Sequence, residues 1–252
     1  MKKIILALII SLGIMPVFAV EDASVKETTA QDVAIDEIPE PPTSVGPKSN
    51  IEKAMGAQPN YPAKYTFEYI NKITPQYKCV GKEEIFYIAL DMLKDTTGEF
   101  SRLAILGNNL TEKPVKIEFK NLSEINKDYA EFDALGWKKG KRLYIYVNPR
   151  HKDAPAGAIA ALLSHEALHQ DEYNSLAEET YAWTMEAAVW CEILNEYPES
   201  GDDKMQPLVV REDTLKKLFE KGNYTNKYIK KTVVQNKGYQ NLPSTSPGFE
   251  EL

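Results

Sequence analysis

Hydrophobic positions along the chain recur at two spacings, one typical of helices and the other typical of strands. In residues 82–93 they recur every three or four positions, which predicts a helix, and a further helix is predicted over 100–105. Residues 113–119 and 142–148 alternate between apolar and polar with a period of two, which predicts two strands. Residues 133–140, between these strands, include two glycines and are typical of a loop or hairpin.

Two longer apolar segments follow the second strand and predict a pair of helices. The first is expected to start at Pro155, because proline is tolerated in the first helical turn, and its Ala- and Leu-rich sequence extends over 156–170. Asn174 and Ser175 favour turns and N-caps, so a break is expected there before a second helix over 180–194. Together with the strands, these helices predict an α+β fold.

The composition divides the chain into segments of different kinds. Aromatic residues become frequent from Tyr61, and the 140 residues of 61–200 are enough for one domain with a core. A C-terminal helical extension is predicted over 201–241. Residues 242–252 contain proline and serine and are expected to form a disordered tail.

The first sixty residues are typical of a leader followed by a linker. Residues 1–19 combine two lysines, an apolar stretch and a small-residue cleavage site, which predicts a secretory signal peptide of bacterial type, with an uncleaved membrane anchor as the alternative. Residues 20–60 are acidic and contain proline, which favours a disordered spacer, with a pro-segment as the alternative. We therefore expect an exported protein, periplasmic or extracellular. No stable membrane insertion is expected after signal cleavage, because no other segment is apolar enough.

Charge and known modules exclude some classes of partner. The formal net charge is -7, and the sequence contains neither a glycine-rich phosphate loop nor a nucleic-acid-binding module, so no nucleic-acid partner is expected. Lysines gather in two helices predicted over 213–221 and 223–234, where a solvated helix face is the usual role. The sequence leaves the oligomeric state open.

The chain has two cysteines, Cys79 and Cys191. An even number of cysteines in an exported chain favours a disulfide between them, because the compartment is oxidising. Two free thiols are the open alternative, since the sequence does not place the two residues close together.

The most specific chemical signal is the H-E-x-x-H motif at residues 165–169. On a helix, His165 and His169 lie one turn apart on one face, so both imidazoles can reach one metal ion. Glu166 is displaced around the helix and suits a carboxylate that accepts a proton from metal-activated water. The motif predicts a catalytic zinc site with one Zn2+ per chain. The alternative is a pair of core histidines that bind no metal.

A catalytic zinc site needs a third protein ligand, and the segment after the motif offers two glutamates. The break at Asn174 and Ser175 would turn the chain back toward the histidines. Ser175 and Glu178 are spaced as a capping box, which would occupy Glu178 and leave Glu179 as the ligand. Glu178 remains the alternative ligand. Glu186 lies two turns from Glu179 and could orient a histidine, although a solvated glutamate is the more common case.

The motif, followed by a second helix that carries Glu179-Thr180-Tyr181-Ala182, resembles zincin metallopeptidases of the gluzincin-like kind. The resemblance covers residues 142–190. In the best-known gluzincins the third ligand follows the second histidine by roughly twenty residues, whereas Glu179 follows His169 by ten. The resemblance implies a zincin-like fold, in which a small sheet packs beside the H-E-x-x-H helix and a Glu-bearing helix follows.

Together, these features predict an exported zinc-dependent metallopeptidase. Glu166 would be the general base, and His165, His169 and Glu179 would hold the zinc. Peptides or proteins would be the substrates. The strand at 142–148 could bind an extended peptide at the sheet edge, or equally be an internal strand. Tyr173, Tyr181 and His151 are candidates for stabilising the oxyanion that forms during hydrolysis. The alternative function is a non-catalytic envelope protein, either a zincin-fold binding protein or a structural protein.

Overall fold

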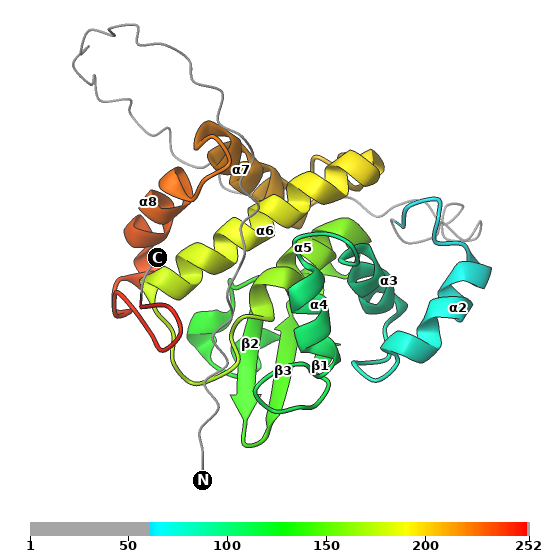
Figure 1. Cartoon of the computed structure of the whole chain (residues 1–252), viewed down its shortest axis with the longest axis horizontal. Coiled ribbons are helices and arrows are strands. Elements are labelled where there is room, and N and C mark those ends of the chain that lie inside the picture. The colour runs from blue at the N-terminus through cyan, green and yellow to red at the C-terminus, as the bar shows by residue number, and fades with distance from the viewer. Residues whose placement is uncertain (1–60, 251–252) are drawn as a thin grey trace, which may run out of the picture. The chain divides into compact units, whose positions relative to one another are not determined.

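The structure of the protein is a computed structural model, and it describes residues 61–250. These residues form an α+β fold of seven helices and one three-stranded sheet (Figure 1). The helices are α2 (Phe67–Tyr77), α3 (Glu84–Met92), α4 (Glu99–Leu106), α5 (Ala156–Glu166), α6 (Leu176–Glu196), α7 (Pro207–Lys221) and α8 (Lys227–Gln235). The strands are β1 (Lys116–Phe119), β2 (Ala134–Lys139) and β3 (Arg142–Val147). The predicted signal peptide and the linker up to residue 60 lie outside the described residues.

The sheet has the order β1-β3-β2, so β3 is its central strand. β1 runs parallel to β3, and β2 pairs with β3 as an antiparallel hairpin. The hairpin alternative for residues 133–140 is therefore confirmed. The idea that the strand at 142–148 forms the open edge beside the site is wrong, because both of its sides are paired. Of the two outer strands, β2 lies beside the helix that carries the motif.

Helix α5 is the centre of the core, and every one of its residues is buried. Its apolar residues surround the helix on all sides, as is typical of a helix enclosed by the fold. It packs between α3 and α6. At Gly157 an added Cβ would lie 2.6 Å from Ser200 Oγ and 2.8 Å from Ile193 Cγ2, so the glycine permits a close approach of α6. This close packing brings the glutamates of α6 near the motif.

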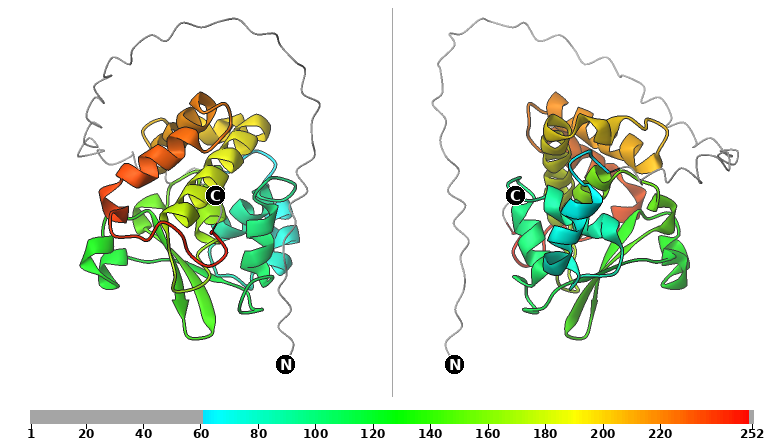
Figure 2. Two further views of the ribbon diagram at one scale, coloured as in Figure 1. Left: turned by 60° about the vertical axis from the view of Figure 1, so that its left-hand side comes forward. Right: turned by 90° about the vertical axis from the view of Figure 1, so that its right-hand side faces the viewer.

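Helix α6 lies between the motif helix and the C-terminal helices. Figures 1 and 2 show α7 and α8 on one side of α6, with α3 and α4 on the other. Leu208 and Val209 of α7 belong to the same buried cluster as α5. The region predicted as a C-terminal extension therefore contributes to the main core. Its helices cover the side of α6 that would otherwise expose apolar residues.

Residues 242–250 are ordered in the structure, contrary to the disordered tail expected from their composition. The backbone carbonyls of Pro243 and Ser244 accept hydrogen bonds from the N–H groups of Leu176 (2.9 Å) and Ala177 (3.1 Å). These N–H groups belong to the first turn of α6 and have no partner within the helix. The tail is held in place because its carbonyl groups accept hydrogen bonds from the otherwise unpaired N–H groups at the start of α6.

Cys79 and Cys191 are free thiols, so the disulfide considered from the sequence is not formed. Cys79 follows α2, whereas Cys191 lies in the second half of α6. Residues 61–250 contain no helix with the length and apolar character needed to cross a membrane.

Candidate metal centre

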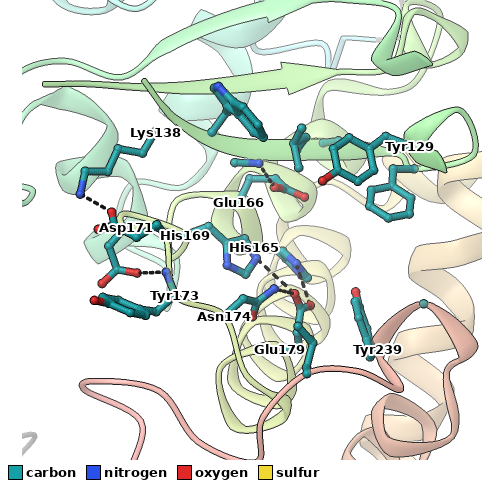
Figure 3. Close-up of a pocket in the computed structure, with 18 residues that line it drawn as sticks. Tyr129, Lys138, His165, Glu166, His169, Asp171, Tyr173, Asn174, Glu179 and Tyr239 are labelled. Atoms are coloured by element: carbon teal, nitrogen blue, oxygen red, sulfur yellow. Dashed lines mark hydrogen bonds and ion pairs between the residues drawn. The ribbon is translucent and has the colours of Figure 1, made fainter. Parts of the chain in front are cut away.

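Three side chains converge between α5, α6 and the loop that joins them. His165, His169 and Glu179 each offer one donor atom, and these atoms all lie within 4.8 Å of one another (Figure 3). His165 Nε2 is 3.7 Å from Glu179 Oε2, and His169 Nε2 is 3.8 Å from Glu179 Oε1. Among the described residues this is the one cluster of histidine, cysteine and acidic side chains with metal-ligand spacing.

The two histidines come together by a different route from the one predicted. Helix α5 ends at Glu166, so His169 lies beyond it rather than on a helix that extends to residue 170. The chain continues in a tighter turn, in which the Leu168 N–H donates to the His165 carbonyl at 3.0 Å. The ring centroids are 5.3 Å apart. The turn keeps the imidazoles adjacent and also redirects the chain toward α6.

Glu179 returns to the histidines because α6 begins where the sequence indicated. Ser175 is the N-cap, and its hydroxyl accepts a hydrogen bond from the Glu178 N–H at 3.1 Å. Glu179 is then in the first turn of the helix, close to the motif. Asn174 donates a side-chain hydrogen bond to Glu179 Oε1 at 2.6 Å. The residue expected only to break the helix therefore also orients the candidate ligand.

Each histidine has a carboxylate on its Nδ1 atom. Glu186 Oε2 lies 2.9 Å from His165 Nδ1, and Glu178 Oε1 lies 2.9 Å from His169 Nδ1. With Nδ1 occupied, each ring directs Nε2 into the cluster. The alternative in which Glu178 is the ligand is not supported by this geometry. Glu178 does not close the capping box either, because its side chain turns to His169. The sequence favoured a solvated Glu186, but this residue is fully buried.

The charges of this cluster shift the pKa values of its members. Burial raises the pKa of Glu166, although the two histidines act against it. Burial also acts to raise the pKa of Glu179, but His165 and His169 outweigh it and lower that pKa. The pKa of His169 is raised to about 9: burial opposes this shift, but the hydrogen bond with Glu178 and the charges of Glu179 and Glu166 outweigh burial. The cluster thus attracts positive charge.

Glu166 is fixed by the backbone of the outer strand. The Gly136 N–H donates to Glu166 Oε2 at 2.6 Å, so this amide points away from β3. A Cβ added at Gly136 would lie 2.8 Å from His169 Cβ and 3.0 Å from the Glu166 carbonyl oxygen. Only a glycine allows the strand to approach the motif this closely. The carboxylate is held beside the candidate ligands, where a proton acceptor for water is needed.

The donor set fits a zinc ion. Two histidine nitrogens and one glutamate oxygen are among the ligand sets of catalytic zinc. Tetrahedral bonds of about 2.0–2.1 Å place neighbouring donor atoms roughly 3.4 Å apart, close to the separations of 3.7 Å and 3.8 Å seen here. Glu179 Oε2 is buried and has no hydrogen-bond partner, and such an atom in a native structure calls for a partner such as an ion.

A cavity of about 460 Å3 opens in front of the three candidate ligands. Of the residues considered for oxyanion stabilisation, Tyr173 lines this cavity. His151 instead lies fully buried against Asp133, with its Nε2 2.7 Å from the carboxylate. Tyr181 packs on Phe249. Neither His151 nor Tyr181 is part of the lining. Residues from β2, the loop after the motif and the C-terminal segment form the walls.

Several residues around the site were not identified from the sequence. They lie beside the candidate ligands, Glu166 or the glutamates that orient the histidines, and all lie outside the motif: Gly136, Asn174, Arg211, Tyr239 and Ser246. The glycine could have been noticed as a break in the alternation of a strand. Asn174 was marked only as a turn residue, and nothing in the local pattern marks the other three, because their roles depend on tertiary contacts.

Comparison of the chain with protein-family models, with curated proteins and with solved structures returned no significant match.

Proposed function

We propose that this chain is an exported zinc-dependent metallopeptidase with a zincin-like form of the α+β fold. The observation that carries the proposal is the convergence of His165, His169 and Glu179, with Glu166 held beside them by the Gly136 amide. Its export rests on the signal-like sequence of residues 1–19.

In this proposal His165 Nε2, His169 Nε2 and Glu179 hold the ion. Zinc in such a site supplies Lewis-acid chemistry, because it lowers the pKa of a bound water and polarises a carbonyl. Glu166 accepts the proton of the attacking water and later delivers it to the leaving amine. Its burial supports this role, since a raised pKa brings the carboxylate closer to neutral pH, where it can both accept and return a proton.

The open edge of β2 is the best candidate for binding an extended peptide. Because the Gly136 amide points away from β3, the backbone groups of the alternate residues Ala134 and Lys138 face the same way. A substrate can pair with such an edge as an additional strand. The edge also borders the cavity, so a bound peptide would pass in front of Glu166.

The first experiment is the zinc content of the purified mature protein and of three variants. We expect about one zinc per chain in the parent, and its loss in His165→Ala and in Glu179→Ala. Glu178→Ala should retain zinc with weaker affinity, because Glu178 contacts His169 through Nδ1 and not through Nε2, the atom that faces the ion. Zinc retained in Glu179→Ala but lost in Glu178→Ala would exchange the roles of the two glutamates.

The second experiment separates catalysis from binding. Glu166→Gln keeps the size of the side chain but removes the proton acceptor, so it should bind zinc and cleave a peptide library at least 100-fold more slowly than the parent. Equal rates would refute Glu166 as the general base. A zinc-loaded parent that cleaves nothing in the library would favour the non-catalytic binding protein.

A further inference from the structure

We infer that the C-terminal region, residues 207–246, is the positioning scaffold of the metal centre. Arg211 holds Glu186, which orients His165, and Ser246 holds Glu178, which orients His169. Tyr239 lies beside Glu179, the third ligand. The inference deepens the proposed function and rests on it.

The first connection runs from Arg211 through Glu186 to His165. Arg211 on α7 grips the Glu186 carboxylate with both terminal nitrogens, Nη1 on Oε1 and Nη2 on Oε2, the latter at 2.9 Å. The same Oε2 atom lies 2.9 Å from His165 Nδ1. A forked guanidinium contact fixes the plane of a carboxylate as well as its position. The rotation of the His165 ring therefore depends on a residue 46 positions later in the chain.

Arg211 is itself held from other directions. Its Nη1 lies 2.9 Å from Glu212 Oε1, and its Nε lies 3.3 Å from Asp133 Oδ2. Asp133 directly precedes β2, the strand whose Gly136 amide holds Glu166. The guanidinium thus joins the His165 side of the centre to the start of the strand that positions the general base.

The second connection runs from Ser246 through Glu178 to His169. The buried Ser246 hydroxyl donates to Glu178 Oε2 at 2.9 Å, and Glu178 Oε1 lies 2.9 Å from His169 Nδ1. Ser246 Oγ also lies 2.9 Å from the hydroxyl of the N-cap Ser175. The tail therefore holds Glu178 by its side chain while its backbone carbonyls hold the first turn of the same helix.

The third connection is between Tyr239 and Glu179. Figure 3 shows Tyr239 beside Glu179, on the side of the cavity formed by the C-terminal segment. The Trp183 indole N–H donates to the Tyr239 oxygen at 3.2 Å. An indole can only donate, so the Tyr239 hydroxyl is the acceptor in this contact and is held in place beside the Glu179 carboxylate.

Residues 207–246 contact the side chains that position the ligands. Substitutions in this region should therefore weaken zinc binding although no ligand is replaced. Mutating a residue that positions a metal ligand typically lowers metal affinity by about 10- to 100-fold. We expect such a loss of zinc affinity in Arg211→Gln, Ser246→Ala and Tyr239→Phe. The effect should be largest for Arg211→Gln, because this variant loses a charged contact in which two nitrogens bind one carboxylate.

The test is zinc dissociation constants measured on the full mature chain by competition with a chelator, together with the visible spectra of the cobalt-loaded proteins. Matched controls are Ser244→Ala, Tyr224→Phe and Lys217→Gln, whose side chains are exposed. The controls should match the parent. The three variants should show weaker zinc binding and altered cobalt spectra, and Ser246→Thr, which keeps the hydroxyl, should recover most of the affinity.

The outcomes separate this inference from the proposed function. Parent-like zinc affinity and cobalt spectra in all three variants would overturn the inference while leaving the peptidase proposal intact, even if the metal-free proteins melted earlier. If Arg211→Gln does not fold, Arg211→Lys replaces it, because lysine keeps the charge but cannot contact both Glu186 oxygens with two nitrogens. A parent-like zinc affinity in Arg211→Lys would contradict the inference. A parent that binds no zinc would overturn both.

Discussion

His165 and His169 belong to one motif but are held in different ways. His165 lies on α5, its side chain is 5% exposed, and its partner Glu186 is gripped by the charged fork of Arg211. His169 lies beyond the helix end, its side chain is 14% exposed, and its partner Glu178 is held by a neutral hydroxyl. Breaking a buried charged contact costs more than breaking a neutral one. The site therefore has a rigid His165 side and a more adaptable His169 side.

This asymmetry has a functional consequence. The His165 side is continuous with the core through α5 and α6, whereas the His169 side faces β2 and the loop that lines the cavity. Under the proposed function, substrate would arrive on the adaptable side. The rigid side would then keep the ligands in place while the other side adjusts to different peptides.

The largest expected effect comes from removing the charge on the rigid side. Glu186→Gln keeps the shape of the side chain but leaves Arg211 without its forked partner, so we expect a loss of about 3 kcal/mol in the free energy of unfolding of the metal-free protein. This lies at the low end for a buried pair, because 22% of the Arg211 side chain remains exposed. Urea unfolding followed by circular dichroism measures it.

The matched change on the other side is Glu178→Gln. It should cost only about 1 kcal/mol, since the amide oxygen can still accept the Ser246 hydrogen bond. Equal losses in the two variants would remove the distinction between a rigid and an adaptable side.

The next effect tests how closely β2 approaches the His169 side. In Gly136→Ala the new methyl group would meet His169 Cβ at 2.8 Å, so strand or histidine must move, at a cost of about 2 kcal/mol. Because the same amide holds Glu166, peptide hydrolysis should fall by at least tenfold. Both stability and kcat/KM are measured.

Gly140→Ala is the control for this strand. Gly140 has φ of +59° and no atom within 4 Å of an added Cβ, so alanine there strains the backbone by about 1 kcal/mol without crowding the site. Activity should be unchanged. If the two alanine variants lost activity equally, the close approach at Gly136 would not matter.

A smaller effect concerns the acid stability of the rigid side. Burial acts to raise the pKa of Asp133, but the hydrogen bond with His151 and the charge of Arg211 outweigh it, so the pKa lies below its usual range. A carboxyl with a lowered folded pKa stabilises the protein above its unfolded pKa of about 3.9, and this contribution is lost as the pH falls through the folded pKa. Asp133→Asn should cost about 1 to 2 kcal/mol at pH 7.

The difference between the parent and Asp133→Asn should then shrink as the pH is lowered from about 5 toward 3. Unfolding free energies of the metal-free proteins across this range provide the measurement. A constant difference at every pH would mean that the Asp133 charge does not stabilise the fold.

Local patterns in the sequence predicted part of the fold and part of the site. The presence of α3 and α4, the hairpin, the N-cap of α6 at Ser175 and the cluster of motif residues follow from local patterns, since helix periodicity and caps act over a few residues. The composition of residues 242–250 predicts disorder, but composition does not show that Pro243 and Ser244 supply acceptors to the first turn of α6.

Other features depend on contacts that no local pattern contains. Arg211 and Ser246 look like ordinary polar residues in sequence, and their roles appear only when α7 and the tail pack on α6. The sequence favours a solvated Glu186 over one that orients a histidine, because an isolated glutamate is usually solvated. The burial of Glu186 is possible because Arg211 compensates its charge and His165 Nδ1 lies within hydrogen-bonding distance, and both residues come from other helices.

The smallest expected effect is at the surface of the adaptable side. Lys138 of β2 lies 2.7 Å from Glu172 in the loop after the motif, and 31% of the Lys138 side chain and 66% of the Glu172 side chain are exposed. Exposed pairs of this kind contribute little to stability, so Lys138→Ala should leave the urea midpoint and the zinc affinity unchanged. Because the pair ties the outer strand to the loop, KM for a peptide should respond modestly if the loop adapts to substrate. A change in zinc affinity would instead show that this surface contact supports His169, and the adaptable side would then extend to the metal itself.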